Sequence, residues 1–171
     1  MTIHWIGALL FITGSSLEGF RRSNQLQKRQ LALIEFAQAL TWMQNEIVKR
    51  QTPILEIIQT QIQRKGEVGE LFGFFQDQLT MNQSLLKEAW TKAVLAYKPT
   101  SNLSVEDLEW ITRVGDAVQP YDRQSIEKEL SFIIDMLRSR HQEARNLALQ
   151  MGKVYKALGV MGGILIVLLL S

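Results

Sequence analysis

The sequence predicts an all-α protein in which a cytoplasmic helical bundle lies between N- and C-terminal membrane helices. In the last third of the chain, apolar residues recur at alternating steps of four and three from Ile126 to Leu158, and only Arg140 interrupts this stripe. That period is typical of one long amphipathic helix. Apolar runs occupy both ends of the 171-residue chain, and no run of alternating β-branched residues predicts a strand.

The composition argues against several classes of function. Cysteine is absent, so the chain has no disulfide framework, no thiolate nucleophile and no cysteine-based zinc site. Its two histidines are too few for a histidine-rich metal centre. With 19 Lys and Arg against 17 Asp and Glu, the net charge of +2 gives little support for nucleic-acid binding. We therefore expect no metal, no cofactor and no nucleic-acid partner.

The N-terminal segment, residues 1–20, is predicted to be an uncleaved membrane anchor. Its apolar run has about the minimum length of a spanning helix, although Ser15 and Glu18 weaken its end. A cleaved signal peptide would place basic residues before the run, whereas here Arg21 and Arg22 follow it. A buried core helix remains the alternative, because Glu18 would be awkward deep in lipid.

The C-terminal segment, residues 154–171, is predicted to be the second membrane helix. Beyond Leu158 the sequence is apolar all round, which suits lipid better than a protein core. That run rises only about 20 Å against roughly 30 Å of hydrocarbon, so the span has to begin before it. Lys153 and Lys156 lie on its N-terminal side, so the basic flanks of both anchors face the same insert. By the positive-inside rule, residues 21–153 form a cytoplasmic helical domain.

Proline and helix-capping residues divide the insert into short helices. Thr52 supplies a capping hydroxyl before Pro53, which is expected at the first position of a new helix. Ser104 with Asp107 resembles a capping box, and Asp122 is expected to cap the long helix. The helices are predicted over residues 26–50, 53–66, 68–79, 84–97 and 104–119, with the long helix starting after residue 122.

The sequence offers no catalytic constellation, and we expect that the protein is not an enzyme. Neither a phosphate-binding loop of the GxxxxGK[ST] type nor a GxGxxG motif after a strand occurs. Neighbouring acids fall at helix starts or on polar faces, where the helix dipole favours them without any catalysis. These acids are Glu67 and Glu70, Glu106 and Asp107, and Glu127 and Glu129. His141, and the tryptophans at positions 42, 90 and 110, are interpreted as structural.

A pair of glycines in the C-terminal apolar run could support packing between membrane helices. Gly159 and Gly163 are four residues apart, and such a small-xxx-small spacing lets another helix approach closely. The spacing is also common by chance in membrane segments, so it is a weak indication.

The second interaction candidate is the turn from Gly115 to Ser125, which joins two predicted helices. At about 1.5 Å per residue, the start of the long helix would stand some 50 Å from Leu158. The turn is therefore expected at the membrane-distal end of the domain, where charges are solvated. A well-capped helix hairpin with no binding role is the alternative interpretation. The candidate docking residues are Asp116, Tyr121, Asp122 and Arg123.

Several short motifs are informative through their order and spacing. They are the spaced glycines at 7, 14 and 19, Glu46-Ile47, Thr52-Pro53-Ile54, Ala89-Trp90, the turn from Gly115 to Arg123, and Tyr155-Lys156-Ala157-Leu158-Gly159. Taken together, these motifs resemble the stage III sporulation protein AB family of endospore-forming bacteria. The resemblance covers nearly the whole chain, although the chain departs from the family pattern at Gln119 and Ile126.

The resemblance implies a role in the complex that joins the mother cell to the forespore. Family members lie in the outer forespore membrane and face the mother-cell cytoplasm, and their soluble part is similar to type II secretion F-family platform proteins. The implied function is a non-enzymatic membrane platform that docks a secretion-type ATPase, stage III sporulation protein AA. Other stage III sporulation channel subunits and membrane lipid are further implied partners, and homo-oligomerisation is left open.

A function of a different class remains open from the residues alone. The chain would then be a small membrane-anchored regulatory or adaptor protein whose helical domain binds a ligand or another coiled coil. A neighbouring gene for a Walker-motif ATPase would favour the platform, and a neighbouring kinase or transcription factor would favour the adaptor.

The basic flanks generate a prediction about topology. A reporter that is active only outside the cytoplasm should be active when fused after Ser171 and silent when fused after Gln51, because both flanks place the insert inside. Reporter activity measured in intact cells tests this expectation, and the opposite pattern would rule out a cytoplasmic insert between two membrane anchors.

Overall fold

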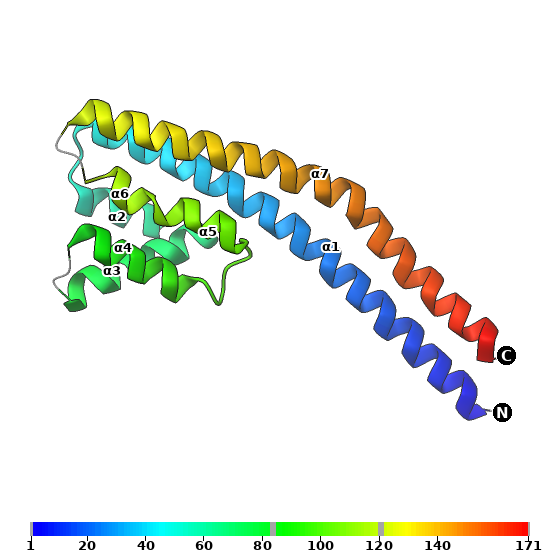
Figure 1. Cartoon of the computed structure of the whole chain (residues 1–171). Coiled ribbons are helices and arrows are strands. Elements are labelled where there is room, and N and C mark those ends of the chain that lie inside the picture. The colour runs from blue at the N-terminus through cyan, green and yellow to red at the C-terminus, as the bar shows by residue number, and fades with distance from the viewer. Residues whose placement is uncertain (1, 83–84, 120–121, 171) are drawn as a thin grey trace. The chain divides into compact units, whose positions relative to one another are not determined.

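The computed structural model is all-α throughout the residues that it describes (Figure 1). It describes the backbone of residues 2–82, 85–119 and 122–170, and the side chains of residues 21–80, 85–119, 122–151, 154, 157 and 161. This confirms the predicted fold class. The elements are α1 (Thr2–Asn45), the π-helical turn η1 (Glu46–Arg50), α2 (Ile54–Ile62), α3 (Glu67–Asn82), α4 (Leu86–Tyr97), α5 (Val105–Thr112), α6 (Val114–Ala117) and α7 (Arg123–Leu170).

The chain forms two compact units, and α1 and α7 each contribute to both. The first unit combines residues 1–30 with residues 142–171, and the second comprises residues 31–141. Every buried cluster and every groove considered below belongs to the second unit, which we call the helical unit.

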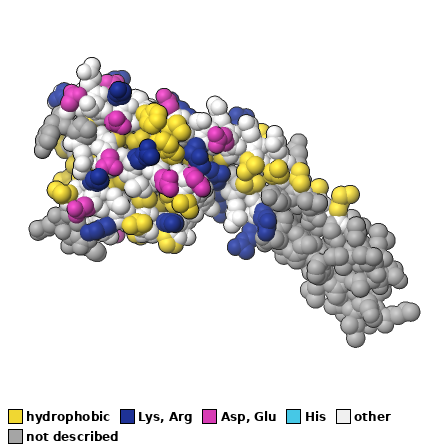
Figure 2. Space-filling model, in the orientation of Figure 1, with side chains coloured by type: hydrophobic (Ala, Val, Ile, Leu, Met, Phe, Trp, Pro, Cys, Tyr) yellow, Lys and Arg dark blue, Asp and Glu magenta, His cyan; other side chains and the backbone are white. Residues whose placement is uncertain are grey.

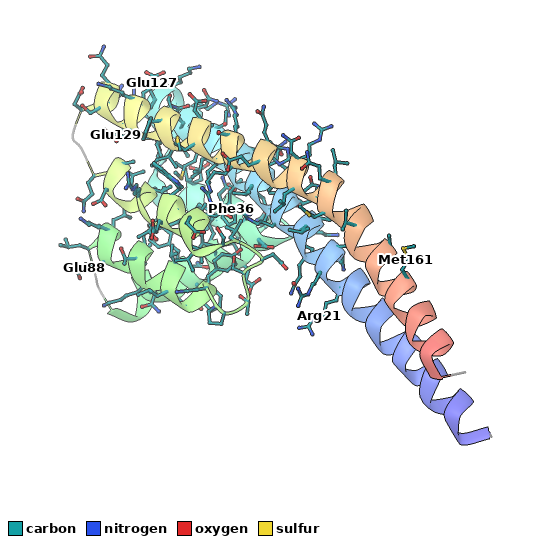
Figure 3. All side chains as sticks on the ribbon, turned by 45° about the vertical axis from the view of Figure 1, so that its right-hand side comes forward. Arg21, Phe36, Glu88, Glu127, Glu129 and Met161 are labelled. Atoms are coloured by element: carbon teal, nitrogen blue, oxygen red, sulfur yellow. The ribbon has the colours of Figure 1, made fainter. Side chains whose placement is uncertain are left out.

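Within the helical unit, α3 packs against α2 and α4, and α4 packs against α5 and α6. Phe36 of α1 lies among these helices (Figure 3). Each helix contributes apolar side chains at helical spacing, so burial of one face explains the assembly. The largest fully buried apolar side chains are Leu33, Phe36, Leu40, Ile57, Ile58, Leu71, Phe72, Tyr97, Ile111, Leu130 and Leu137.

Trp90 occupies the centre of the contact between α4, α3 and α6. Its side chain is 3% exposed, and its indole N–H donates to the carbonyl oxygen of Ile111 at 2.8 Å. The rings of Phe72 and Phe75 meet it edge-on, with centroids 5.4 and 5.0 Å away. A Cβ atom on Gly115 would lie 2.9 Å from Trp90 Cδ1, so glycine permits the close approach of α6. Trp90 is therefore a core residue, as the sequence indicated.

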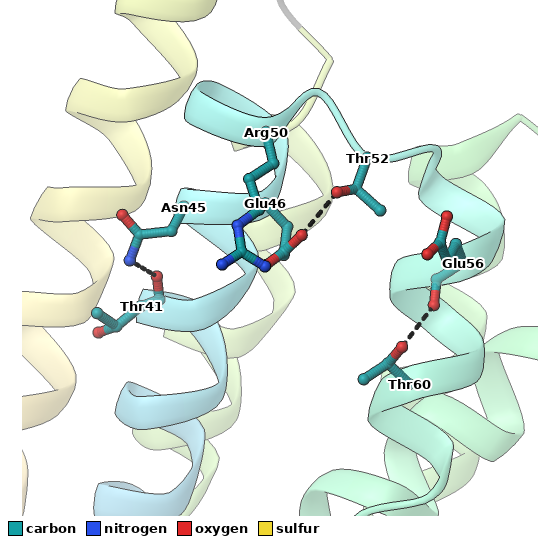
Figure 4. A network of polar contacts seen from close by, with 7 residues as sticks. All are labelled: Thr41, Asn45, Glu46, Arg50, Thr52, Glu56 and Thr60. Carbon is teal, nitrogen blue, oxygen red and sulfur yellow. Dashed lines mark hydrogen bonds and ion pairs between the residues drawn. The ribbon is translucent and has the colours of Figure 1, made fainter.

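The structure at the end of α1 shows that the predicted Thr52 cap is wrong. α1 runs to Asn45 and continues as the π-helical turn, and Gln51 then reverses the chain with a φ of 58°. The Thr52 hydroxyl donates to Glu46 Oε2 at 2.6 Å, so it does not cap α2 (Figure 4). Pro53 takes the N-cap position rather than the first helical position. This hydrogen bond pairs the buried Glu46 carboxylate, whose charge burial would otherwise penalise.

The predicted helix over residues 104–119 is instead two helices. The capping box at its start is present, since Ser104 accepts from the Asp107 N–H and Asp107 accepts from the Ser104 N–H. The chain then turns at Arg113, and α6 begins one residue later. This interruption accompanies the approach of Gly115 to Trp90.

Arg140, which interrupts the apolar stripe of α7, has a partner in the core of the helical unit. Its guanidinium Nε donates to Oδ1 of Asp107, a carboxylate with no exposed surface. Its Nη2 lies 3.9 Å from Glu106 Oε2 at the surface. The apparent defect in the stripe is thus an ion pair between α5 and α7.

The first turn of α3 fixes the loop after α4. Glu67 accepts hydrogen bonds from the Tyr97 hydroxyl and from Asn102 Nδ2, the latter at 2.6 Å, and Glu70 accepts from Thr100 at 2.6 Å. Burial, followed by the hydrogen bond to Glu67, raises the pKa of Tyr97. Partial burial, followed by the nearby Glu67 carboxylate, raises the pKa of Glu35. Glu67 and Glu70 therefore make specific hydrogen bonds in addition to any stabilisation by the helix dipole.

In the first unit, residues 1–30 and 142–171, the side chains that the structure describes include several exposed basic residues. Arg21, Arg22 and Lys28 are exposed on α1, whereas the small residues Ser23 and Ala144 are each 2% exposed. The apolar stripe of α7 is not buried along its whole length, because its later members are substantially exposed. Leu147 and Met151 are each 39% exposed, and Val154 is 46% exposed.

No helix within the described residues is both long enough and apolar enough to cross a membrane. The predicted N-terminal anchor, residues 1–20, lies outside the described side chains. The predicted C-terminal membrane helix, residues 154–171, lies outside them except at Val154, Ala157 and Met161. Both anchors therefore stay predictions.

The burial of Trp90 predicts a large loss of stability on truncation. Trp90→Ala should lower the free energy of unfolding by about 3–5 kcal/mol, because it removes both packing and a buried hydrogen bond. Chemical denaturation followed by circular dichroism measures this change. Leu95→Ala is the matched control on the same helix, where the side chain is 63% exposed, and it should cost less than about 0.5 kcal/mol. A Trp90→Ala loss below about 1 kcal/mol would contradict the packing described.

Candidate docking surface

A groove of about 460 Å³ lies between α6 and the early turns of α7. We call it the α6–α7 groove, and it belongs entirely to the helical unit. In Figure 2, hydrophobic side chains gather where α7 passes beside α5 and α6, with acidic and basic side chains around them. The groove is lined by Arg113, Asp116, Ala117, Glu129, Phe132 and Ile133.

An exposed aromatic residue forms one wall of the groove. Phe132 is 54% exposed, although Ile133 beside it is 2% exposed. The half-buried ring of Trp110 on α5 meets Phe132 edge-on, with centroids 5.7 Å apart. The Arg113 guanidinium carbon lies 4.5 Å from the centroid of the same Trp110 ring. The Phe132 ring thus packs against Trp110, and about half of its surface remains exposed.

The polar rim of the groove carries two exposed acids. Asp116 on α6 pairs with Lys87 on α4 at 2.5 Å, and both side chains are about half exposed. Glu129 stands on α7 in the wall with Phe132, and it is labelled with Glu127 in Figure 3. Exposed pairs of this kind contribute little to stability, about 0–1 kcal/mol, so these charges can be used in recognition at small cost to the fold.

Asp122 is a structural cap rather than a free charge. Its carboxylate accepts from the Ser125 backbone N–H at 3.0 Å, from the Ser125 hydroxyl at 2.9 Å and from the Gln124 N–H at 3.4 Å. The hydrogen bonds from Ser125, hydroxyl first, and then from Gln124 hold the pKa of Asp122 below its usual range. The predicted N-cap of the long helix is confirmed.

The other predicted site residues lie in different parts of the chain, and some of them lie outside the described residues. Asp116 lines the α6–α7 groove, and Arg123 is exposed at the first position of α7. Tyr121 lies outside the described residues, as do the details of Gly159 and Gly163 in the predicted membrane helix. The structure thus places one predicted docking residue in a groove and assigns another, Asp122, to the helix cap.

Sequence reasoning missed the aromatic part of this surface. Trp110 is interpreted from the sequence as structural, and it is half-buried with its ring packed against Phe132. The sequence did contain a signal. Phe132 lies between two stripe residues, Leu130 and Ile133, but does not itself follow the four-and-three period of the stripe. A large aromatic residue on the polar side of an amphipathic helix is a candidate contact residue.

The arrangement of side chains around the groove is suited to binding. Apolar anchors beside a charged rim resemble the core and rim of protein–protein interfaces. Within the residues that the structure describes, no cluster of three or more His, Asp or Glu could hold a metal ion.

Comparison with known proteins identifies the family. The family model described as stage III sporulation protein AB matches residues 4–171. The chain belongs to the stage III sporulation protein AB family. It is 25% identical over 166 residues to stage III sporulation protein AB of Bacillus subtilis (strain 168), covering 96% of this chain and 97% of that protein. A solved structure of stage III sporulation protein AB has the same fold, with a TM-score of 0.66, 24% identity, and coverage of 71% of this chain and 96% of that one.

The Asp122 cap predicts a pH-dependent contribution to stability. A carboxyl whose pKa is lowered by folding stabilises the fold above its unfolded-state pKa, about 3.9, and loses that contribution as the pH falls through its folded-state pKa. Asp122→Ala should therefore lower the melting temperature at pH 7, and the difference should vanish at about pH 2. Glu127→Ala, a matched change on the same helix, should alter the melting temperature little. An Asp122→Ala deficit that is equal at both pH values would contradict an ionised cap.

Proposed function

We propose that this member of the stage III sporulation protein AB family is a non-catalytic membrane platform that docks a secretion-type ATPase. In this proposal, the helical unit faces the mother-cell cytoplasm and the terminal segments of α1 and α7 anchor it in the outer forespore membrane. The platform would hold the ATPase beside the other subunits of the mother cell–forespore channel complex.

The observation that carries the proposal is the α6–α7 groove. A supported, exposed aromatic ring beside two exposed acids supports the proposal, because aromatic residues are enriched among the residues that dominate binding energy. The exposed basic residues that follow the N-terminal apolar run support cytoplasmic orientation of the insert. Function in sporulation is supported by the family itself.

Charge reversal on the docking surface tests the proposal. The wild-type chain, purified at full length in lipid nanodiscs, should bind the secretion-type ATPase saturably. Asp116→Lys combined with Arg123→Glu should weaken that binding at least tenfold, about 1.4 kcal/mol, because both exposed charges change sign. The melting temperature should change little, since Asp116 makes an exposed ion pair with Lys87 and Arg123 is exposed.

A matched control makes the same two charge changes elsewhere on the helical unit. Asp77→Lys with Lys98→Glu alters exposed residues on α3 and just after α4, outside the groove, and should leave binding within twofold. Absence of ATPase binding to the wild-type chain would overturn the platform proposal. Equal weakening by both double variants would show a general charge effect and would place the docking residues elsewhere.

A further inference from the structure

We propose that the first unit of the chain binds anionic lipid headgroups through four exposed basic residues. These are Arg21, Arg22 and Lys28 on α1 and Arg145 on α7, and we call them the basic band. Membrane anchoring of the unit rests on the proposed function. The preference for anionic over neutral lipid goes beyond that function, and it follows from the charge, the exposed side chains and the helix lengths of the unit.

Charge is divided unequally between the two units. The first unit contains seven Lys or Arg and two Asp or Glu, whereas the helical unit contains twelve Lys or Arg and fifteen Asp or Glu. The first unit is therefore strongly basic in a chain whose net charge is only +2, and the helical unit is acidic. A negatively charged surface attracts the first unit and does not attract the helical unit.

The basic residues of the first unit lie in a short part of each helix. On α1 all four lie between Arg21 and Arg29, directly after the N-terminal apolar run, and three of them are exposed. On α7 all three lie between Arg145 and Lys156, directly before the C-terminal apolar run. Both helices thus change from basic to apolar toward the ends of the chain, which is the order of headgroups and hydrocarbon in a bilayer leaflet.

The acids of the first unit are too few to neutralise this charge. Glu18 precedes the basic band on α1, and Glu143 is exposed on α7. However these two carboxylates pair, the unit keeps a net charge of +5. Phosphatidylglycerol and similar lipids supply the phosphate groups that complement it.

Exposed aliphatic side chains beside the basic band distinguish a lipid surface from a soluble polyanion. Leu147 and Leu149, which follow Arg145, are 39% and 59% exposed, and Met151 and Val154 are 39% and 46% exposed. A nucleic acid would pair with the basic residues and leave these aliphatic side chains in water. A bilayer offers phosphate to the basic residues and hydrocarbon to the aliphatic ones.

The lengths of the helices place the bilayer on the terminal side of the basic band. α1 is unbroken over residues 2–20 and α7 over residues 151–170, and each segment spans about 30 Å at about 1.5 Å per residue. This length matches the hydrocarbon thickness of a bilayer. The two lysines of residues 151–170 fall in its first two turns, from which long side chains can reach the interface. The headgroup layer then lies at Arg21 on α1 and just after Arg145 on α7.

The relative affinity for anionic lipid tests the inference on the full-length chain. The protein is placed in bilayers of phosphatidylcholine that contain spin-labelled phosphatidylglycerol or spin-labelled phosphatidylcholine. Electron paramagnetic resonance then gives the association constant of one lipid relative to the other at the protein surface. The wild-type chain should prefer phosphatidylglycerol at least twofold at low salt, and high salt should abolish the preference.

Charge reversal within the basic band locates the preference. Arg21→Glu combined with Arg145→Glu lowers the net charge of the first unit from +5 to +1 and should bring the relative association constant close to one. Lys49→Glu with Lys98→Glu is the matched control, because both lysines are exposed on the helical unit and the charge of the whole chain changes equally. The control should keep the wild-type preference, and thermal melts confirm that each variant is folded.

The absence of cysteine allows a second test with single fluorescent labels. Met151→Cys and Gln142→Cys place a label on either side of the expected boundary on α7, and both parent side chains are exposed. Lipids that carry a spin label on the acyl chain should quench the label at position 151 more than the label at position 142. Equal quenching at the two positions would overturn the assigned boundary.

The outcomes separate this inference from the proposed function. If the wild-type chain stays in the membrane fraction but shows no preference for phosphatidylglycerol, the inference fails and the platform proposal stands. Equal loss of preference in both double variants would also overturn the inference, because the preference would then follow total charge rather than the basic band. If alkaline carbonate extracts the wild-type chain from membranes, the membrane anchoring and the inference fail together.

Discussion

The arrangement of α7 on the helical unit depends on a buried ion pair between Asp107 and Arg140. Asp107 has no exposed surface, so its charge would be strongly destabilising without a partner. Arg140 reaches it from α7, while the Ser104 N–H donates to the same carboxylate. One contact therefore completes the cap of α5 and fixes the axial position of α7. Phe132 lies eight residues, or about two turns, before Arg140, and so it is brought beside Trp110 of α5.

The carboxylates of the helical unit divide into structural and surface groups. Asp107 and Glu46 are buried and paired, and Glu67 binds the loop after α4. These acids cannot contact a partner without loss of the contacts that hold the fold. Asp116 and Glu129 are exposed, so they can serve recognition without that conflict. The same residue type thus has opposite roles, decided by burial.

Prediction from sequence succeeded where a local pattern controls the outcome. The Asp122 cap and the Ser104–Asp107 capping box follow from short-range hydrogen bonds, and both form as expected. Thr52 shows where this reasoning fails, because its hydroxyl donates to Glu46, which is six residues away in sequence but adjacent in space. The contact of Phe132 with Trp110 was missed for the same reason, since it joins residues on different helices.

The sequence by itself determined the all-α class, most helix positions, the caps at Ser104 and Asp122, and the family, because these depend on periodicity, short-range hydrogen bonding and the order of motifs. The tertiary structure alone decided which polar residues are buried and which apolar residues are exposed. Arg140 looked like a defect in an apolar stripe until Asp107 was placed opposite it. Phe132 and Trp110 looked like ordinary helix residues until α5 and α7 were brought together. Helix periodicity defines a face, but only the neighbouring helices determine what that face meets.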